Sequence, residues 1–159
     1  MSGNTVKLDK IDRRLLHDLQ EDGRMTNVEL AKRAGISAPP CLRRVRALEE
    51  NGLIKGFHAE LNARAIGYNV TVFAHVGLKS QAENDLDVFE KLTKSWPEVR
   101  ECHMLAGETD FLLKIVAPSW EDYQDFLTAK LTAAENVKQV KSALSVKTTK
   151  QLPGVPIEI

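Results

Sequence analysis

The chain has few of the features that mark several large classes of protein. Its two cysteines, Cys41 and Cys102, lie far apart in the sequence, which favours free thiols over a disulfide. It has no run of about 18 apolar residues, so we expect no membrane-spanning helix. The N-terminal stretch M-S-G-N-T-V-K-L-D-K has no apolar signal core. We therefore expect a cytoplasmic protein.

Motifs that carry common enzyme chemistry are also missing. No G-x-x-x-x-G-K-[ST], G-x-S-x-G or C-x-x-C motif occurs. The four histidines have no H-x-x-x-H spacing. Cys102 and His103 would point to opposite faces of a strand, so they could not share a metal ion well. The sequence therefore predicts no catalytic residue, no metal site and no cofactor.

Charge is balanced over the whole chain but not along it. Residues 1–66 contain 12 Lys and Arg against 9 Asp and Glu, whereas residues 67–159 contain 10 against 13. A mildly basic N-terminal part followed by an acidic remainder is typical of a DNA-binding domain joined to a separate assembly domain. The difference is small and decides little by itself.

Residues 26–53 predict two short helices joined by a tight turn, after a first helix at about residues 9–20. Thr26 and Glu29 have the spacing of a capping box, and Gly35 permits the turn. Ser37 would cap the second helix, with Leu42, Val45 and Leu48 on its inward face. Residues 53–61 alternate around a glycine, which predicts a small two-stranded wing. These elements make a winged helix-turn-helix domain over residues 1–62, with the helix-turn-helix at about residues 27–46.

The second helix of this motif carries three arginines. In helix-turn-helix proteins the start of this helix faces base edges in the major groove, and arginine binds guanine or phosphate. The alternative is a solvated basic face paired with Glu49 or Glu50. In the capped helix-turn-helix context we favour DNA binding, and the predicted contact residues are Asn27, Ser37, Ala38, Pro39, Cys41, Arg43, Arg44 and Arg46.

Beyond a hinge at residues 63–68 the pattern changes. Residues 69–150 alternate strands and helices in the order β-α-β-β-α-β, which predicts a ferredoxin-like domain and makes the whole chain α+β. Residues 151–159 would be an extended tail with the capacity to pack on a neighbour. The turn at residues 107–110 is a candidate ligand site, because free N–H groups can hold a carboxylate and Asp110 can hold an ammonium. From the residues alone, an ordinary hairpin turn is the favoured interpretation.

The chain resembles the Lrp/AsnC, or feast/famine, family of transcription regulators. The resemblance begins at L-D-K-I-D-R-R-L-L-H-D-L-Q-E-D-G-R, continues through N-V-E-L-A-K-R-A-G-I-S-A-P-P-C-L-R-R-V-R-A-L-E-E-N-G-L-I-K-G-F and resumes at E-C-H-M-L-A-G-E-T-D-F-L-L-K. The P-C-L-x-R-V-R and E-C-H segments look closest to the leucine-responsive branch.

The resemblance implies that the second domain binds a small amino-acid effector between subunits and assembles into homodimers, often into octamers. It places the effector contacts at Leu105, Ala106, Gly107 and Asp110, and the same turn includes Glu108 and Thr109. Many relatives have an aromatic residue in this turn, so the effector of this chain is left open.

The leading hypothesis is a sequence-specific regulator that binds double-stranded DNA on the nucleoid and responds to a leucine-like amino acid, not an enzyme. One alternative is an enzyme of the same architecture, similar to the sirohaem decarboxylases, with His75 or His103 in its site. Another is an architectural protein that compacts DNA with little sequence preference.

Overall fold

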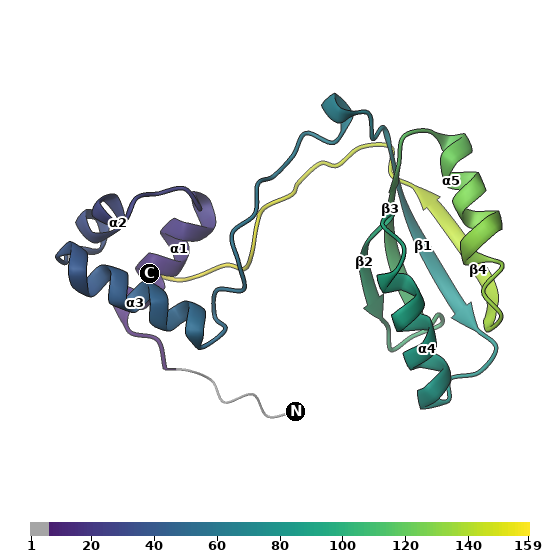
Figure 1. Cartoon of the computed structure of the whole chain (residues 1–159), viewed down its shortest axis with the longest axis horizontal. Coiled ribbons are helices and arrows are strands. Elements are labelled where there is room, and N and C mark those ends of the chain that lie inside the picture. The colour runs from purple at the N-terminus through teal and green to yellow at the C-terminus, as the bar shows by residue number, and fades with distance from the viewer. Residues whose placement is uncertain (1–6) are drawn as a thin grey trace. The chain divides into compact units, whose positions relative to one another are not determined.

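A computed structural model describes residues 7–159, which form two compact units (Figure 1). Residues 7–60 and Lys150–Ile159 form one of them, which we call the helical unit. Leu61–Thr149 forms the other, the sheet unit. The chain thus leaves the helical unit once and returns to it at its C-terminal end. In the described part of the chain no helix is both long and apolar enough to cross a membrane.

The helical unit contains α1 (Lys10–Glu21), α2 (Asn27–Ala34) and α3 (Ala38–Glu50). Each of the first two helices begins with a capping box, at Asp9 for α1 and at Thr26 for α2. The capping box predicted at Thr26 is therefore confirmed. The backbone of Gly35 ends α2 in the left-handed region, at φ 68°, which a residue with a side chain adopts at a cost.

The core of the helical unit is small. Its buried members are Leu15, Leu19, Leu30, Ala31, Cys41 and Leu48. On α3 the inward stripe therefore runs through Cys41, Val45 and Leu48, at helical spacing. The prediction that Leu42 belongs to this stripe is wrong, because Leu42 lies about 100° further round the helix and is 41% exposed.

The predicted wing is not paired as two strands. Residues 53 and 54 form a bend and residues 55–61 have no regular secondary structure, and the N–H groups of Leu53 and Ile54 both donate to the Leu48 carbonyl. Of residues 53–61 only Ile54 is even partly buried. The alternation of apolar residues around Gly56 suggested a hairpin, but so little of it is buried that two isolated strands gain too little from pairing.

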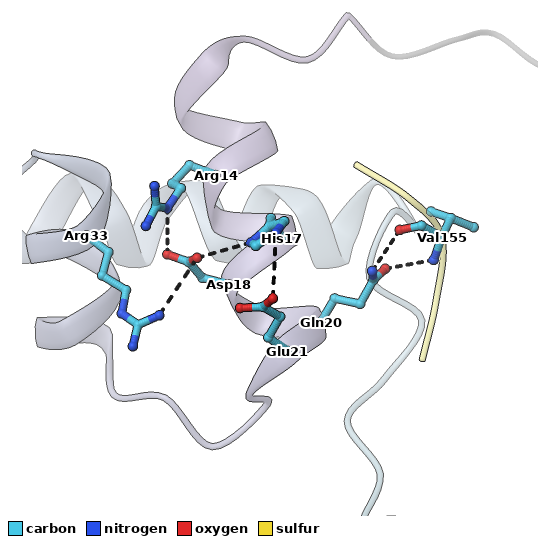
Figure 2. Close-up of polar contacts among 7 residues, drawn as sticks. All are labelled: Arg14, His17, Asp18, Gln20, Glu21, Arg33 and Val155. Atoms are coloured by element: carbon cyan, nitrogen blue, oxygen red, sulfur yellow. Dashed lines mark hydrogen bonds and ion pairs between the residues drawn. The ribbon is translucent and has the colours of Figure 1, made fainter. Parts of the chain in front are cut away.

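A buried carboxylate joins α1 to α2. Asp18 is 1% exposed, and its Oδ2 accepts a hydrogen bond of 2.9 Å from Arg14 Nε (Figure 2). Its Oδ1 lies 3.3 Å from His17 Nδ1 and 3.9 Å from Arg33 Nη1, which belongs to α2. Burial opposes the charged form of Asp18, but the contacts with Arg14 and His17 outweigh it and lower the pKa of the carboxyl.

The sheet unit consists of β1 (Val70–Leu78), α4 (Glu83–Lys94), β2 (Val99–Met104), β3 (Phe111–Ala117), α5 (Trp120–Phe126) and β4 (Val137–Leu144). A 3-10 turn at Arg64–Ile66 precedes β1, and a π-helical turn at Leu127–Leu131 extends α5. The strand order is β2-β3-β1-β4, and all neighbours are antiparallel. This is the predicted ferredoxin-like arrangement, which confirms the α+β class.

One face of the sheet packs against the two helices. Alternate residues of β1 and β3 are fully buried there, and Phe89 of α4 and Tyr123 and Phe126 of α5 join the same core. The residues between them point to the opposite face, where Phe73 is 36% exposed and Lys114 pairs with Glu101 at 2.7 Å. Both helices of the sheet unit, α4 and α5, pack on the first face.

We predict that Asp18→Asn destabilises the helical unit by about 1–3 kcal/mol at neutral pH, because Arg14 loses a buried charged partner. The pKa of Asp18 is lowered in the folded state, so its contribution is present above its ordinary value of 3.8 and is lost as pH falls through the folded value. Urea unfolding followed by helical circular dichroism would measure this. Glu50→Gln, at an exposed position of α3 with no ion pair in residues 7–159, is the matched control. A difference between wild type and Asp18→Asn that is the same at neutral and strongly acidic pH would contradict the prediction.

Candidate functional site

The turn between α2 and α3 is fixed by backbone and side-chain contacts. The Ile36 N–H donates to the Ala31 carbonyl at 3.0 Å, and Ile36 packs against the core of the helical unit. The Asn27 side-chain amide donates to the Ala38 carbonyl at 2.8 Å, so the first residue of α2 contacts the first residue of α3. The angle between the two helices is therefore held at both ends of the turn.

Asn27 and Cys41, both predicted at the DNA surface, are placed differently by these contacts. Asn27 Nδ2 is engaged with Ala38, and its Oδ1 is buried with no hydrogen-bond partner in residues 7–159. Cys41 is fully buried, and that burial raises the pKa of its thiol. The Cys41 side chain is a core residue and does not face bases, which corrects the prediction for it. Sequence reasoning missed this because the inward stripe of α3 was placed one residue too far along.

The start of α3 presents few backbone donors. Ser37 is the N-cap residue but its hydroxyl makes no cap hydrogen bond, and Pro39 and Pro40 have no N–H. Ser37 and Pro39 are exposed, and Ala38 is partly exposed. A nucleic acid at this end of the helix would therefore meet a hydroxyl group and apolar surface rather than a cluster of N–H groups.

The three arginines of α3 have different surroundings. Arg43 and Arg46 are exposed and form no ion pair with any residue from 7 to 159. Arg44 Nη1 lies 2.7 Å from Asp12 Oδ1 and 2.8 Å from Asp9 Oδ2, both at the start of α1. These hydrogen bonds raise the pKa of the Arg44 guanidinium. Arg44 thus joins α3 to α1, while Arg43 and Arg46 remain available to a partner. The alternative pairing with Glu49 or Glu50 does not occur.

The turn between β2 and β3 is held from both sides. Leu105 N–H donates to the Asp110 carbonyl at 2.8 Å, and Asp110 N–H donates to the Val76 carbonyl at 3.0 Å. The Asp110 Oδ2 accepts a 2.6 Å hydrogen bond from the N–H of Leu78, at the end of β1. Thr109 is 7% exposed, and its hydroxyl lies 3.3 Å from His75 Nδ1.

This arrangement leaves binding groups free at the turn. The N–H groups of residues 106–109 donate to no acceptor within the described residues, and Ala106, Gly107 and Glu108 are exposed. A Cβ on Gly107 would meet nothing within 4 Å. Asp110 uses Oδ2 internally, and its Oδ1 accepts no hydrogen bond from residues 7–159. Unpaired N–H groups beside a carboxylate oxygen suit the two charged ends of an amino acid.

Sequence reasoning missed the residues of other strands that border this turn. His75 and Leu78 contact Thr109 and Asp110, as described above. Gln139 of β4 lies over Gly77, where an added Cβ would be 3.0 Å from Gln139 Cγ. Strand alternation could have placed His75 on the second face, but the register that brings Gln139 beside Gly77 is a long-range property.

One group of possible metal ligands occurs in the described residues. His17, Asp18 and Glu21 offer ligand atoms within 4.8 Å of one another. Arg14 and Arg33 already contact the Asp18 carboxylate, and their positive charges disfavour a cation there. The group contributes to the joint between α1 and α2.

Each of the two units matches a known family of domains. Winged helix-turn-helix DNA-binding domains match residues 8–55, and the Lrp/AsnC ligand binding domain matches residues 71–155. A transcriptional regulator from Neisseria meningitidis, solved as an L-Met complex, is 33% identical and covers 94% of this chain and 97% of its own, with a TM-score of 0.89. An AsnC family transcriptional regulator from Agrobacterium tumefaciens is 32% identical, with the same two coverages and a TM-score of 0.87.

Curated relatives agree with these structures. The leucine-responsive regulatory protein of Rhizobium meliloti strain 1021 is 53% identical over 152 residues, which are 96% of this chain and 97% of that protein. The protein of the same name from Escherichia coli K12 is 38% identical over 144 residues, or 91% and 88%. The fold and these matches together define a transcription regulator with a DNA-binding helix-turn-helix unit and a ligand-binding unit. The chain belongs to the Lrp/AsnC family.

We predict that Asp110→Ala and Asp110→Asn differ in stability. Alanine leaves the Leu78 N–H without its acceptor and should cost about 1–3 kcal/mol, whereas asparagine keeps an acceptor oxygen and should cost less. Trp96 and Trp120 both lie in the sheet unit, so their fluorescence during urea unfolding reports on it. Glu108→Ala, at an exposed position of the same turn, is the control. Equal losses for the two Asp110 variants would show that the Leu78 hydrogen bond is not the cause.

Proposed function

We propose that α3 lies in the DNA major groove, with Arg43 and Arg46 as its principal contacts. The observation that carries this proposal is that both arginines are exposed and unpaired in residues 7–159, on the second helix of a capped helix-turn-helix. Ser37, Ala38 and Pro39 would lie nearest the bases. The proposed activity is binding, with no catalytic step.

We propose a different role for Arg44. Its guanidinium is shared between Asp9 and Asp12, so its first task is to orient α3 against α1. A phosphate could still approach the remaining donors of a guanidinium that uses one nitrogen in these contacts. Asn27 would likewise act mainly by holding the start of α3 through Ala38.

We propose that the chain acts as a homodimer, assembling further up to an octamer, on DNA in the cytoplasm. The uncovered face of the sheet carries exposed Phe73 and partly buried Leu112 and Val116, which an apolar contact with a second copy would cover. A dimer would place two copies of α3 on half-sites about one helical turn apart.

We propose that the effector is an amino acid held at residues 105–110. Its carboxylate would meet the free N–H groups of residues 106–109, and its ammonium would meet Asp110 Oδ1. The leucine-responsive names of the relatives and the L-Met complex of the Neisseria protein support an apolar side chain. Such a ligand regulates only by binding one assembly state more tightly than another.

We predict three distinct phenotypes for the arginines in gel-shift titrations on the upstream DNA of the protein's own gene. Arg46→Ala should weaken binding to all sequences and reduce the salt slope by about 1, as loss of a phosphate contact does. Arg43→Ala should relax sequence preference. Arg44→Ala should weaken binding because α3 loses its contacts with α1. Binding that survives unchanged in the triple alanine variant would refute the interface.

Two controls sharpen this series. Arg13→Ala removes an exposed charge from α1 without an ion pair in residues 7–159 and should have a smaller effect. Asp12→Asn separates the two roles of Arg44. If Arg44 orients α3, Asp12→Asn weakens binding as Arg44→Ala does. If Arg44 chiefly contacts phosphate, removal of the competing carboxylate strengthens binding instead.

We predict that an apolar amino acid raises the melting temperature of the protein and that Asp110→Asn weakens its binding about tenfold or more, because the ammonium loses its charged partner. A thermal-shift screen of the twenty amino acids, followed by titration of the best one, measures both effects. Asp110→Asn is the informative variant because it keeps an acceptor for the Leu78 N–H. If Asp110→Asn binds the amino acid with wild-type affinity, the ammonium group is not bound by Asp110.

A further inference from the structure

The C-terminal segment contacts the helical unit through one glutamine side chain. Gln20 Nε2 donates to the Val155 carbonyl at 2.7 Å, and the Val155 N–H donates to Gln20 Oε1 at 2.9 Å (Figure 2). Lys150–Ile159 clusters with the helical unit and not with the sheet unit from which it emerges. The family match for the ligand-binding domain nevertheless runs to residue 155, so sequence similarity alone assigns most of this segment to the other unit.

The local sequence of the segment suits this contact. Val155 precedes Pro156, and a residue before proline is biased toward extended backbone. In extended backbone the N–H and C=O of one residue point to the same side, as they do in strand pairing. A glutamine amide offers one acceptor and one donor group in the same way. Gln20 therefore binds Val155 as a neighbouring strand would.

Gly154 is required at the contact for two reasons. Its φ is +64°, in the left-handed region that residues with side chains rarely adopt. A Cβ at this position would also overlap the side-chain amide of Gln20, which would have to leave its place beside Val155. The backbone approaches Gln20 closely because residue 154 has no side chain.

The other connection of the helical unit passes the same end of α1. Gly23 lies two residues beyond the end of α1, and a Cβ on it would lie 3.3 Å from Cδ1 of Phe57. Phe57 lies on the segment that leaves the helical unit, whereas Val155 lies on the segment that returns to it. Both segments therefore pass near the C-terminal end of α1, which is the helix that Arg44 joins to α3.

We propose that Gln20 is a docking site for the chain's own C-terminal segment, and that this contact positions the DNA-binding helix. With the segment docked, the helical unit is held to the sheet unit by two segments instead of one, which restricts its motion on the linker. Gln20 and Gly154 are then positioning residues that set which half-site spacings a dimer can bind. This consequence rests on the proposed dimeric DNA binding.

The docking itself is tested by amide hydrogen exchange on the full-length protein. In wild type the Val155 N–H is protected by Gln20 Oε1, and Gln20→Ala should speed its exchange about fivefold or more. Gly154→Ala should do the same, and the double variant should add nothing, because both changes remove one contact. Gln151→Ala, an exposed position of the same segment, is the control. Unchanged Val155 exchange in Gln20→Ala would overturn the docking.

The positioning role is tested on DNA with paired half-sites at a series of spacings and on a single half-site. Wild type should bind one spacing best. Gln20→Ala should lower affinity at that spacing about tenfold and flatten the series, while single half-site binding stays within about twofold. If Gln20→Ala speeds the exchange of the Val155 N–H but does not change the spacing profile, the positioning role is wrong and the docking contact stands. Failure of wild type to bind any DNA would count against the proposed DNA interface, and exchange would still decide the docking.

Discussion

The small core of the helical unit makes its geometry depend on polar contacts between helices. Six residues form the buried centre of that core among residues 7–159, which is little apolar surface to fix three helix orientations. Asp18 joins α1 to α2, Asn27 joins the starts of α2 and α3, and Arg44 joins α3 to α1. Each pair of helices thus has its own directional contact. Arg43 and Arg46 can be presented in one orientation because Arg44 is paired with Asp9 and Asp12 of α1.

The geometry of the sheet unit, in contrast, depends on its apolar core. Its core is larger and includes alternate residues of β1 and β3, three aromatic side chains of the helices, and Trp96. Burial of one face leaves the second face for other contacts, and the turn at residues 105–110 lies at the end of that sheet. Asp110 is the point where the core meets the proposed ligand site, since one carboxylate oxygen holds β1 while the other accepts no hydrogen bond within residues 7–159. The proposed site is preorganised by the fold rather than by a dedicated loop.

Local sequence signals predicted most of the fold. The capping box at Thr26, the turn glycine and the strand alternation each depend on residues close together in sequence, and the structure confirms the two-part α+β architecture. The winged helix-turn-helix class is confirmed, but the predicted strand pairing within the wing and the predicted outward position of Cys41 were wrong, because both depend on how much surface becomes buried. Arg44 and its partner Asp12 are 32 residues apart in sequence, and Gln20 and its partner Val155 are 135 residues apart. No periodicity in the sequence indicates either pair.

The proposed ligand site and the proposed docking site are connected along the chain by β4. The residues bordering the turn at residues 105–110 include Leu78, where the register between β1 and β4 shifts, and Gln139 near the start of β4. β4 is the last strand before the C-terminal segment, and residues 145–154 connect it to Val155. A ligand at the turn would change DNA binding through this connection only if it binds the docked and undocked forms with different affinities.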